Sequence, residues 1–174
     1  MICRNKETFD KSAAKTKIEK SLKCNFYYVG REWPYKGVKP RIIAEEYMED
    51  AHSTSLRDYK FYCFNGIPQF LYLSEGLEHH STAHMSFVNL DWTFSEYRRN
   101  DYQPFDKLPP KPVHLDEMIE LSRQFSKDIP FLRVDFYEIN EKLYFGELTF
   151  FPGSGFTPFA SENDDVKLGE MLHL

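Results

Sequence analysis

The order of the expected elements predicts an α+β fold. Two segments show apolar residues at helical spacing, and runs rich in Val, Ile, Phe and Tyr follow each of them. The order is helix, strands, a long polar loop, a second helix and further strands, which is typical of the α+β class. With 174 residues and 41% hydrophobic content, the chain can form one domain with a core but not two full ones.

Both predicted helices have clear ends. The first is expected at residues 9–23, where Asp10 is a suitable N-cap and Ala14 begins an apolar repeat of four residues. The second is expected at residues 115–127 and ends before Pro130. Its apolar face is formed by Leu115, Met118, Ile119, Ser122 and Phe125.

Strands are expected first at residues 41–48 and then as a hairpin. The segment RIIAEEYM (41–48) is apolar enough for an interior strand. YKFYCF and IPQFLYL flank an Asn-Gly pair at 65–66, which predicts a hairpin because both central residues of a type I′ turn need a positive φ. Pro68 should push the second strand of this hairpin toward a sheet edge or delay its pairing.

A second hairpin is predicted within FLRVDFYEINEKLYFGELTFFPGSG, residues 131–155. A three-residue turn at 140–142 would place Asp135 opposite Glu147, and directly opposed Cβ atoms lie about 4.5–5.5 Å apart. Two carboxylates at that separation repel each other, whereas a divalent cation between them makes the arrangement favourable. The register matters, since a two-residue turn would break this pairing.

Arg133 extends the predicted site, because it lies opposite Thr149 in the same register. There it would supply a second cation for a transferring phosphate, and the PGSG turn would bring backbone N–H groups near a ligand. The alternative is that Asp135 and Glu147 are solvated on an exposed face, with Arg133 as a neutralising partner. If they bind a metal, replacing both by amides should abolish Mg²⁺-dependent nucleotide binding and keep or raise stability.

Composition excludes several classes of function. The net charge of −5 carries no basic footprint for nucleic acid, and the three cysteines are too far apart for a CxxC pair or a disulfide framework. No apolar run reaches the roughly 20 residues that cross a bilayer, and the N-terminus lacks a signal-peptide core. We therefore expect a cytoplasmic protein without nucleic-acid partners or membrane insertion.

Residues 75–113 are expected to form a long loop-rich excursion with a functional role. His79, His80 and His84 lie close together there, but surface histidines or contacts to an anionic substrate are favoured over a zinc site. Arg98 and Arg99 are expected to be solvated, with binding of a carboxylate or uronate as the alternative.

Three motifs resemble a known family. R-x-D-F, a short turn and then E-x-(N)-x-x-P-G resemble the metal-binding hairpin of the ATP-grasp superfamily. More narrowly, PRIIAEEYMED, LRDYKFYCFNG and LTFFPGSGFTPF resemble the TupA-like ATP-grasp family, which is linked to teichuronopeptide and capsular polysaccharide biosynthesis. The resemblance runs from about residue 9 to residue 174. It implies the C-terminal portion of an ATP-grasp fold, with residues 1–48 ending the first subdomain and residues 49–174 forming the second.

The resemblance also implies ATP and Mg²⁺ as cofactors and assigns roles to residues. Asp58 would bind the ribose hydroxyls, Lys60 would lie near the phosphates or the substrate, and Arg133 would contact the reacting phosphate. The adenine would contact the backbone of Glu45, Glu46, Tyr47 and Met48. The metal ligands would be Asp135, Glu147 and Thr149. Most relatives have Asn at the third position, so Mg²⁺ is expected to be held there through water or by the two carboxylates only.

The implied reaction is that of a carboxylate–amine ligase. A substrate carboxylate, either on a small molecule or linked to a polysaccharide, attacks the γ-phosphate, and an amine captures the acyl phosphate to give an amide. Relatives carry a strand with a Lys and a Gly-rich loop upstream of the first helix, and this chain is expected to lack them. Two alternatives stay open: a transferase acting on polysaccharide (a sugar kinase, or a glycosyltransferase without a DxD motif), and a non-catalytic remnant.

Overall fold

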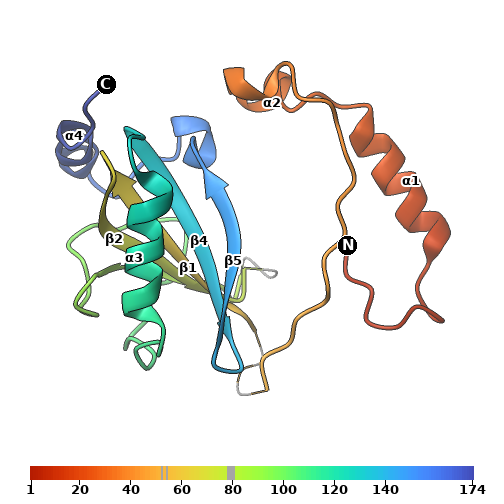
Figure 1. Cartoon of the computed structure of the whole chain (residues 1–174), viewed down its shortest axis with the longest axis horizontal. Helices are drawn as coiled ribbons and strands as arrows, with labels where there is room; N and C mark the ends of the chain where they lie inside the picture. The colour runs from red at the N-terminus through yellow and green to blue at the C-terminus, as the bar shows by residue number, and fades with distance from the viewer. Residues whose placement is uncertain (52, 54, 78–80) are drawn as a thin grey trace. The chain divides into compact units, whose positions relative to one another are not determined.

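The computed structural model describes residues 1–51, 53, 55–77 and 81–174 and divides them into two compact units (Figure 1). Unit 1 consists of Met1–Met48 and Gly153–Gly155, and unit 2 of Glu49–Pro152 and Phe156–Leu174.

Unit 2 is built on an antiparallel sheet with the strand order β3-β2-β1-β4-β5 (Figure 1). The strands are β1 (Arg57–Phe64), β2 (Ile67–Glu75), β3 (His84–Asn89), β4 (Phe131–Ile139) and β5 (Lys142–Thr149). Helix α3 (Leu115–Ser126) packs on one face, and α4 (Glu162–Glu170) lies near the C-terminus. Together with the helices of unit 1, this sheet confirms the predicted α+β class.

Unit 1 contains α1 (Lys11–Leu22), α2 (Tyr27–Gly30) and a 3₁₀ turn, η1 (Trp33–Tyr35). Helix α1 confirms the predicted first helix. Its predicted N-cap is confirmed as well, because the carboxylate of Asp10 accepts a hydrogen bond from the Ala13 amide at 2.8 Å. None of the described helices of either unit combines the length and the apolar character needed to cross a bilayer.

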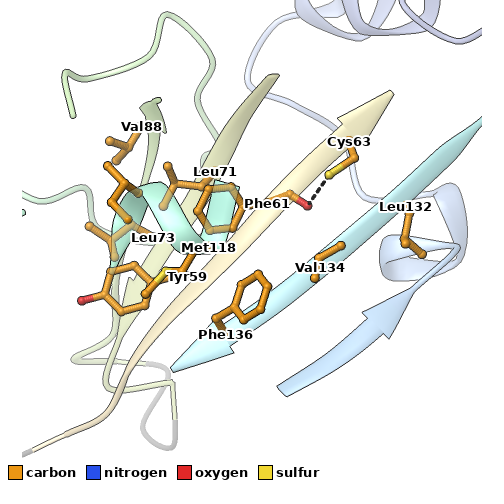
Figure 2. Close-up of a cluster of buried hydrophobic side chains, with 11 residues drawn as sticks. Tyr59, Phe61, Cys63, Leu71, Leu73, Val88, Met118, Leu132, Val134 and Phe136 are labelled. Carbon is orange, nitrogen blue, oxygen red and sulfur yellow. Dashed lines mark hydrogen bonds between the residues drawn. The ribbon is translucent and has the colours of Figure 1, made fainter. Parts of the chain in front are cut away.

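The main core lies between the sheet and α3. Alternate residues of the central strands point toward the helix, as the two-residue period of a strand requires. The predicted apolar face of α3 is largely confirmed, although Phe125 is 41% exposed and contacts Phe145 at the edge of the sheet. Figure 2 shows most of the core cluster, which consists of Tyr59, Phe61, Cys63, Leu71, Leu73, Val88, Leu115, Met118, Leu132, Val134 and Phe136.

The opposite face of the sheet is partly aromatic and partly charged. Tyr62, Phe70 and Phe87 lie on it and pack with one another through ring contacts. Phe159 and Leu168 of the C-terminal segment cover this aromatic half. The charged half lies on β1, β4 and β5 and is described below.

The β1–β2 hairpin has the predicted type of turn. Asn65 and Gly66 both have positive φ, at 50° and 79°, and Phe64 pairs with Ile67. Of the two alternatives expected from Pro68, an edge position is not found, because β2 lies between β1 and β3. Pairing is nevertheless delayed: the register of β1 and β2 shifts beside Pro68, and β3 joins β2 only from Phe70 onward. Pro68 therefore lies where it needs no hydrogen bond to β3.

The β4–β5 hairpin has a two-residue turn, and the three-residue turn predicted for it is wrong. Asn140 and Glu141 have φ values of 50° and 61°, and Ile139 pairs with Lys142. This turn alone would have shifted every pair along the hairpin by one residue.

A bulge restores the predicted register beyond the turn. The register of the ladder shifts between Val134 and Phe136. Phe136 pairs with Phe145 but Val134 pairs with Leu148, so between these two pairs β5 has one residue more than β4. Gly146 lies at this point, where a Cβ atom would come within 3.0 Å of the Asp135 carbonyl oxygen. The small residue therefore allows the two strands to approach closely at the bulge.

Two other predictions about strands are wrong. Residues 41–48 form neither helix nor strand, and Ile42 and Ile43 are exposed, because unit 1 offers no strand with which they could pair. Conversely, β3 lies inside the region predicted to be loop-rich. It has six residues, too few for an alternating pattern to be recognised among polar neighbours.

Candidate functional site

A charged cluster lies on the sheet face opposite α3. Asp58 and Lys60 alternate along β1 with the core residues Tyr59 and Phe61, so they project from the other face. Lys60 is the register partner of Asp135 on β4. The six side chains of the cluster are Asp58, Lys60, Arg133, Asp135, Glu147 and Thr149.

Asp135 is the centre of this cluster. Asp135 is only 1% exposed, and both of its carboxylate oxygens accept hydrogen bonds. Arg133 donates from Nε to Oδ1 at 2.8 Å and from Nη2 to Oδ2 at 2.7 Å, and Lys60 Nζ donates to Oδ2 at 2.8 Å. A buried carboxylate is thus compensated by two cations and three charge-assisted hydrogen bonds.

Arg133 joins Asp135 to the neighbouring strand. Its Nη2 atom also donates to Glu147 Oε1 at 2.8 Å, and Thr149 Oγ1 donates to the same oxygen at 2.8 Å. Arg133 and Thr149 are register partners, which confirms the predicted opposition of these two residues. The two carboxylates converge as expected, but a guanidinium group lies between them.

Asp58 takes part in the same network through Lys60. The Lys60 ammonium donates to Asp58 Oδ1 at 2.9 Å, and Asp58 is 8% exposed. From Asp58 through Lys60, Asp135 and Arg133 to Glu147, charges of opposite sign alternate in direct contact.

The surroundings of the cluster keep its arginine charged. Burial tends to lower the pKa of Arg133, but its hydrogen bonds with Asp135 and the negative charges of Asp135 and Glu147 outweigh this and raise the pKa. Burial, and then the negative charge of Asp58, raise the pKa of Tyr137, so its phenol stays protonated.

Tyr62 and Arg99 extend this face beyond the expected residues. Tyr62 is the register partner of Arg133, and burial raises the pKa of its hydroxyl. Arg99 pairs with Asp101 and lies over the ring of Tyr72, 6.0 Å from the centroid. Tyr62 was not predicted as a site residue from the sequence. The signal was present, because Tyr62 follows Lys60 by two residues, the spacing that places two residues of a strand on one face.

The segment proposed for adenine binding belongs to the other unit. Glu45, Glu46, Tyr47 and Met48 lie in unit 1, outside any strand, whereas the charged cluster lies in unit 2. The strand exit that the resemblance implied is therefore not formed there.

Mg²⁺ requires oxygen ligands, and the predicted donors of the cluster offer two carboxylates and a hydroxyl. Within the part of the chain that the structure describes, no three His, Cys, Asp or Glu residues are grouped closely enough to hold a metal ion. His79 and His80 lie outside the described residues, and His84 on β3 is exposed beside Phe105. The oxygen atoms of Asp135, Glu147 and Thr149 are of the kind that Mg²⁺ takes, because this ion is commonly held by one or two carboxylates together with water and phosphate oxygens. The Arg133 Nη2 atom, within 2.8 Å of both carboxylates, marks a position where one cation reaches both.

Acidic oxygens and fixed cations on one sheet face suit a protein that handles phosphate groups with a divalent cation. The chain belongs to the TupA-like ATPgrasp family, whose pattern it matches over residues 1–173. No curated protein and no solved structure matches the chain.

Proposed function

We propose that this chain is an ATP- and Mg²⁺-dependent protein of the carboxylate–amine ligase type that acts in cell-surface polysaccharide or teichuronopeptide assembly. Its family membership supports ATP-grasp chemistry. The observation that carries the proposal is the convergence of Asp135 and Glu147 on a single cationic group. In this proposal unit 1 is the end of the first ATP-grasp subdomain, unit 2 is the second, and the protein works in the cytoplasm.

The proposed metal donors are Asp135, Glu147 and Thr149. When bound, Mg²⁺ would neutralise the oxygens of the β- and γ-phosphates and orient them for transfer. Arg133 would bind the transferred phosphate, since a guanidinium matches phosphate oxygens as well as it matches carboxylates. The substrate is a carboxylate, on a small molecule or attached to a polymer.

Lys60 is suited to hold a further anionic oxygen. An ammonium group has three N–H donors, and two of them are directed to Asp58 and Asp135. The third can reach a phosphate or a substrate carboxylate. Because Asp58 is engaged with Lys60, we propose that it positions this ammonium group instead of binding ribose.

Calorimetric titration with the non-hydrolysable analogue AMP-PNP in Mg²⁺ tests the proposal. We expect wild type to bind the nucleotide only with Mg²⁺, and the double variant Asp135→Asn/Glu147→Gln to lose at least about tenfold in affinity, since two anionic ligands are removed.

The control double variant is Asp116→Asn/Glu120→Gln. It makes the same change of net charge on α3, where both side chains are more than half exposed, at 92% and 54%. Equal loss of affinity in both double variants, or absence of Mg²⁺-dependent binding in a folded wild-type protein, would refute the proposed function.

A further inference from the structure

The position between the two carboxylates is taken by the chain itself. Arg133 Nη2 lies 2.7 Å from Asp135 Oδ2 and 2.8 Å from Glu147 Oε1. Thr149 directs its hydroxyl to the same Glu147 oxygen at 2.8 Å. Both proposed carboxylate donors therefore contact one guanidinium group, and the third donor, Thr149, is bonded to one of these carboxylates.

A metal ion and this guanidinium group cannot share these oxygens. Mg²⁺ approaches its oxygen ligands to about 2.0–2.1 Å, which would bring it into the space that Nη2 occupies. The Arg133 side chain is only 15% exposed, so water screens the repulsion between the two cations poorly. Binding of a divalent cation between Asp135 Oδ2 and Glu147 Oε1 therefore requires the guanidinium group to leave.

We propose that Arg133 is an internal counter-cation that blocks divalent cations until a polyphosphate offers it a new anionic partner. Cation and nucleotide should then bind with positive coupling, because each makes the site favourable for the other. By thermodynamic linkage, the nucleotide must tighten cation binding by the same factor as the cation tightens nucleotide binding. That the polyphosphate is a nucleotide depends on the function proposed above. The blocking role of Arg133 does not depend on that function.

Two features allow this exchange. Lys60 also contacts Asp135, at 2.8 Å, so the buried carboxylate has a second cationic partner that can remain when Arg133 leaves. Glu147 is 62% exposed at its side chain and can readjust toward a metal ion at little cost. The guanidinium group moves from a carboxylate to a phosphate, and both oxyanions accept its paired N–H donors.

The first test needs no nucleotide. Binding of Mn²⁺, which substitutes for Mg²⁺, is measured by electron paramagnetic resonance of the free ion in wild type and in Arg133→Gln. We expect the variant to bind Mn²⁺ at least about tenfold more tightly, since a charge in contact with both ligands is removed.

Arg99→Gln is the matched control. It removes the same charge from a partly buried arginine that also pairs with an aspartate on this side of the sheet, but Arg99 contacts neither Asp135 nor Glu147. Equal Mn²⁺ affinity in Arg133→Gln and Arg99→Gln would overturn the proposal. Thermal unfolding confirms that each variant is folded.

The second test uses wild type only, so it does not depend on the folding of a variant. Mn²⁺ affinity is compared with and without saturating AMP-PNP, with the Mn²⁺ bound by AMP-PNP alone measured in a titration without protein, and at least about a tenfold gain with the analogue is expected. If the folded wild-type protein binds Mn²⁺ equally well with and without AMP-PNP, the proposed coupling between cation and nucleotide is overturned. If AMP-PNP has no effect but Arg133→Gln still gains Mn²⁺ affinity over Arg99→Gln, the nucleotide function fails and the blocking role of Arg133 stands.

Discussion

At the scale of single residues, the two carboxylates of the site have very different surroundings. Asp135 is 1% exposed at its side chain and contacts two cations, whereas Glu147 is 62% exposed and contacts one. Repulsion between the carboxylates would make their removal stabilising. The structure reverses this expectation for Asp135, because the neutral variant leaves Lys60 and Arg133 without their shared counter-ion.

We predict that Asp135→Asn lowers the free energy of unfolding by about 3 kcal/mol, the cost of removing one partner from a buried ion pair. Glu147→Gln should change it by less than about 1 kcal/mol, as for an exposed pair. Urea denaturation of both variants at pH 7 gives the comparison. Similar effects of the two substitutions would show that the burial of Asp135 contributes little to stability.

At the scale of elements, His114 connects the start of α3 to the β4–β5 turn. Its Nδ1 atom lies 2.9 Å from Glu117 Oε2, and its Nε2 atom lies 3.0 Å from the Glu141 carbonyl oxygen. Both neighbours are acceptors, so only the imidazolium form can donate to both. The hydrogen bond to Glu141, followed by that to Glu117, raises the pKa of His114.

This raised pKa makes the connection dependent on pH. A group whose pKa is higher in the folded state than in the unfolded state contributes its full stabilisation at pH values below the unfolded-state pKa, which is about 6.5 for histidine. This contribution is lost as the pH rises through the folded-state pKa. We predict that the stability difference between wild type and His114→Asn shrinks as pH rises from 5.5 through that range. Urea denaturation across pH measures it, and the exposed His173→Asn is the control. A difference independent of pH would contradict the assignment.

The two hairpins show how far turn chemistry predicts an element. At Asn65-Gly66 the local signal was sufficient, because both residues readily adopt a positive φ. At Asn140-Glu141 the second residue is not a typical left-handed residue, so the two-residue turn was not recognised. The predicted opposition of Arg133 and Thr149 still holds, because the bulge beside Gly146 compensates for the shorter turn.

At the scale of the whole molecule, the two units differ in how much they bury. All residues of the two core clusters come from unit 2. Among residues 1–48, which are all described, Ala14 alone is buried. Most apolar burial, and therefore most of the driving force for folding, lies in unit 2.

We predict that a fragment of residues 49–174 folds without the preceding segment. Because it keeps both clusters, it should unfold cooperatively and retain most of the stability of the full chain, whereas residues 1–48 alone should show no cooperative transition. Thermal unfolding followed by circular dichroism of both fragments checks this. A fragment 49–174 that lacks a cooperative transition would show that unit 1 is required for the fold.

By itself, the sequence determined helices α1 and α3, the first hairpin and the residues that share a strand face, because periodicity and capping are local properties, whereas α2 and α4 were not predicted. Asp135 and Arg133 could be placed on one face for this reason. Only the tertiary structure decided that residues 41–48 form no strand, that β3 joins the sheet, and that Lys60 and Arg133 neutralise Asp135. These outcomes depend on which strands become neighbours and where a bulge falls, and such long-range pairings have no signature in any single segment.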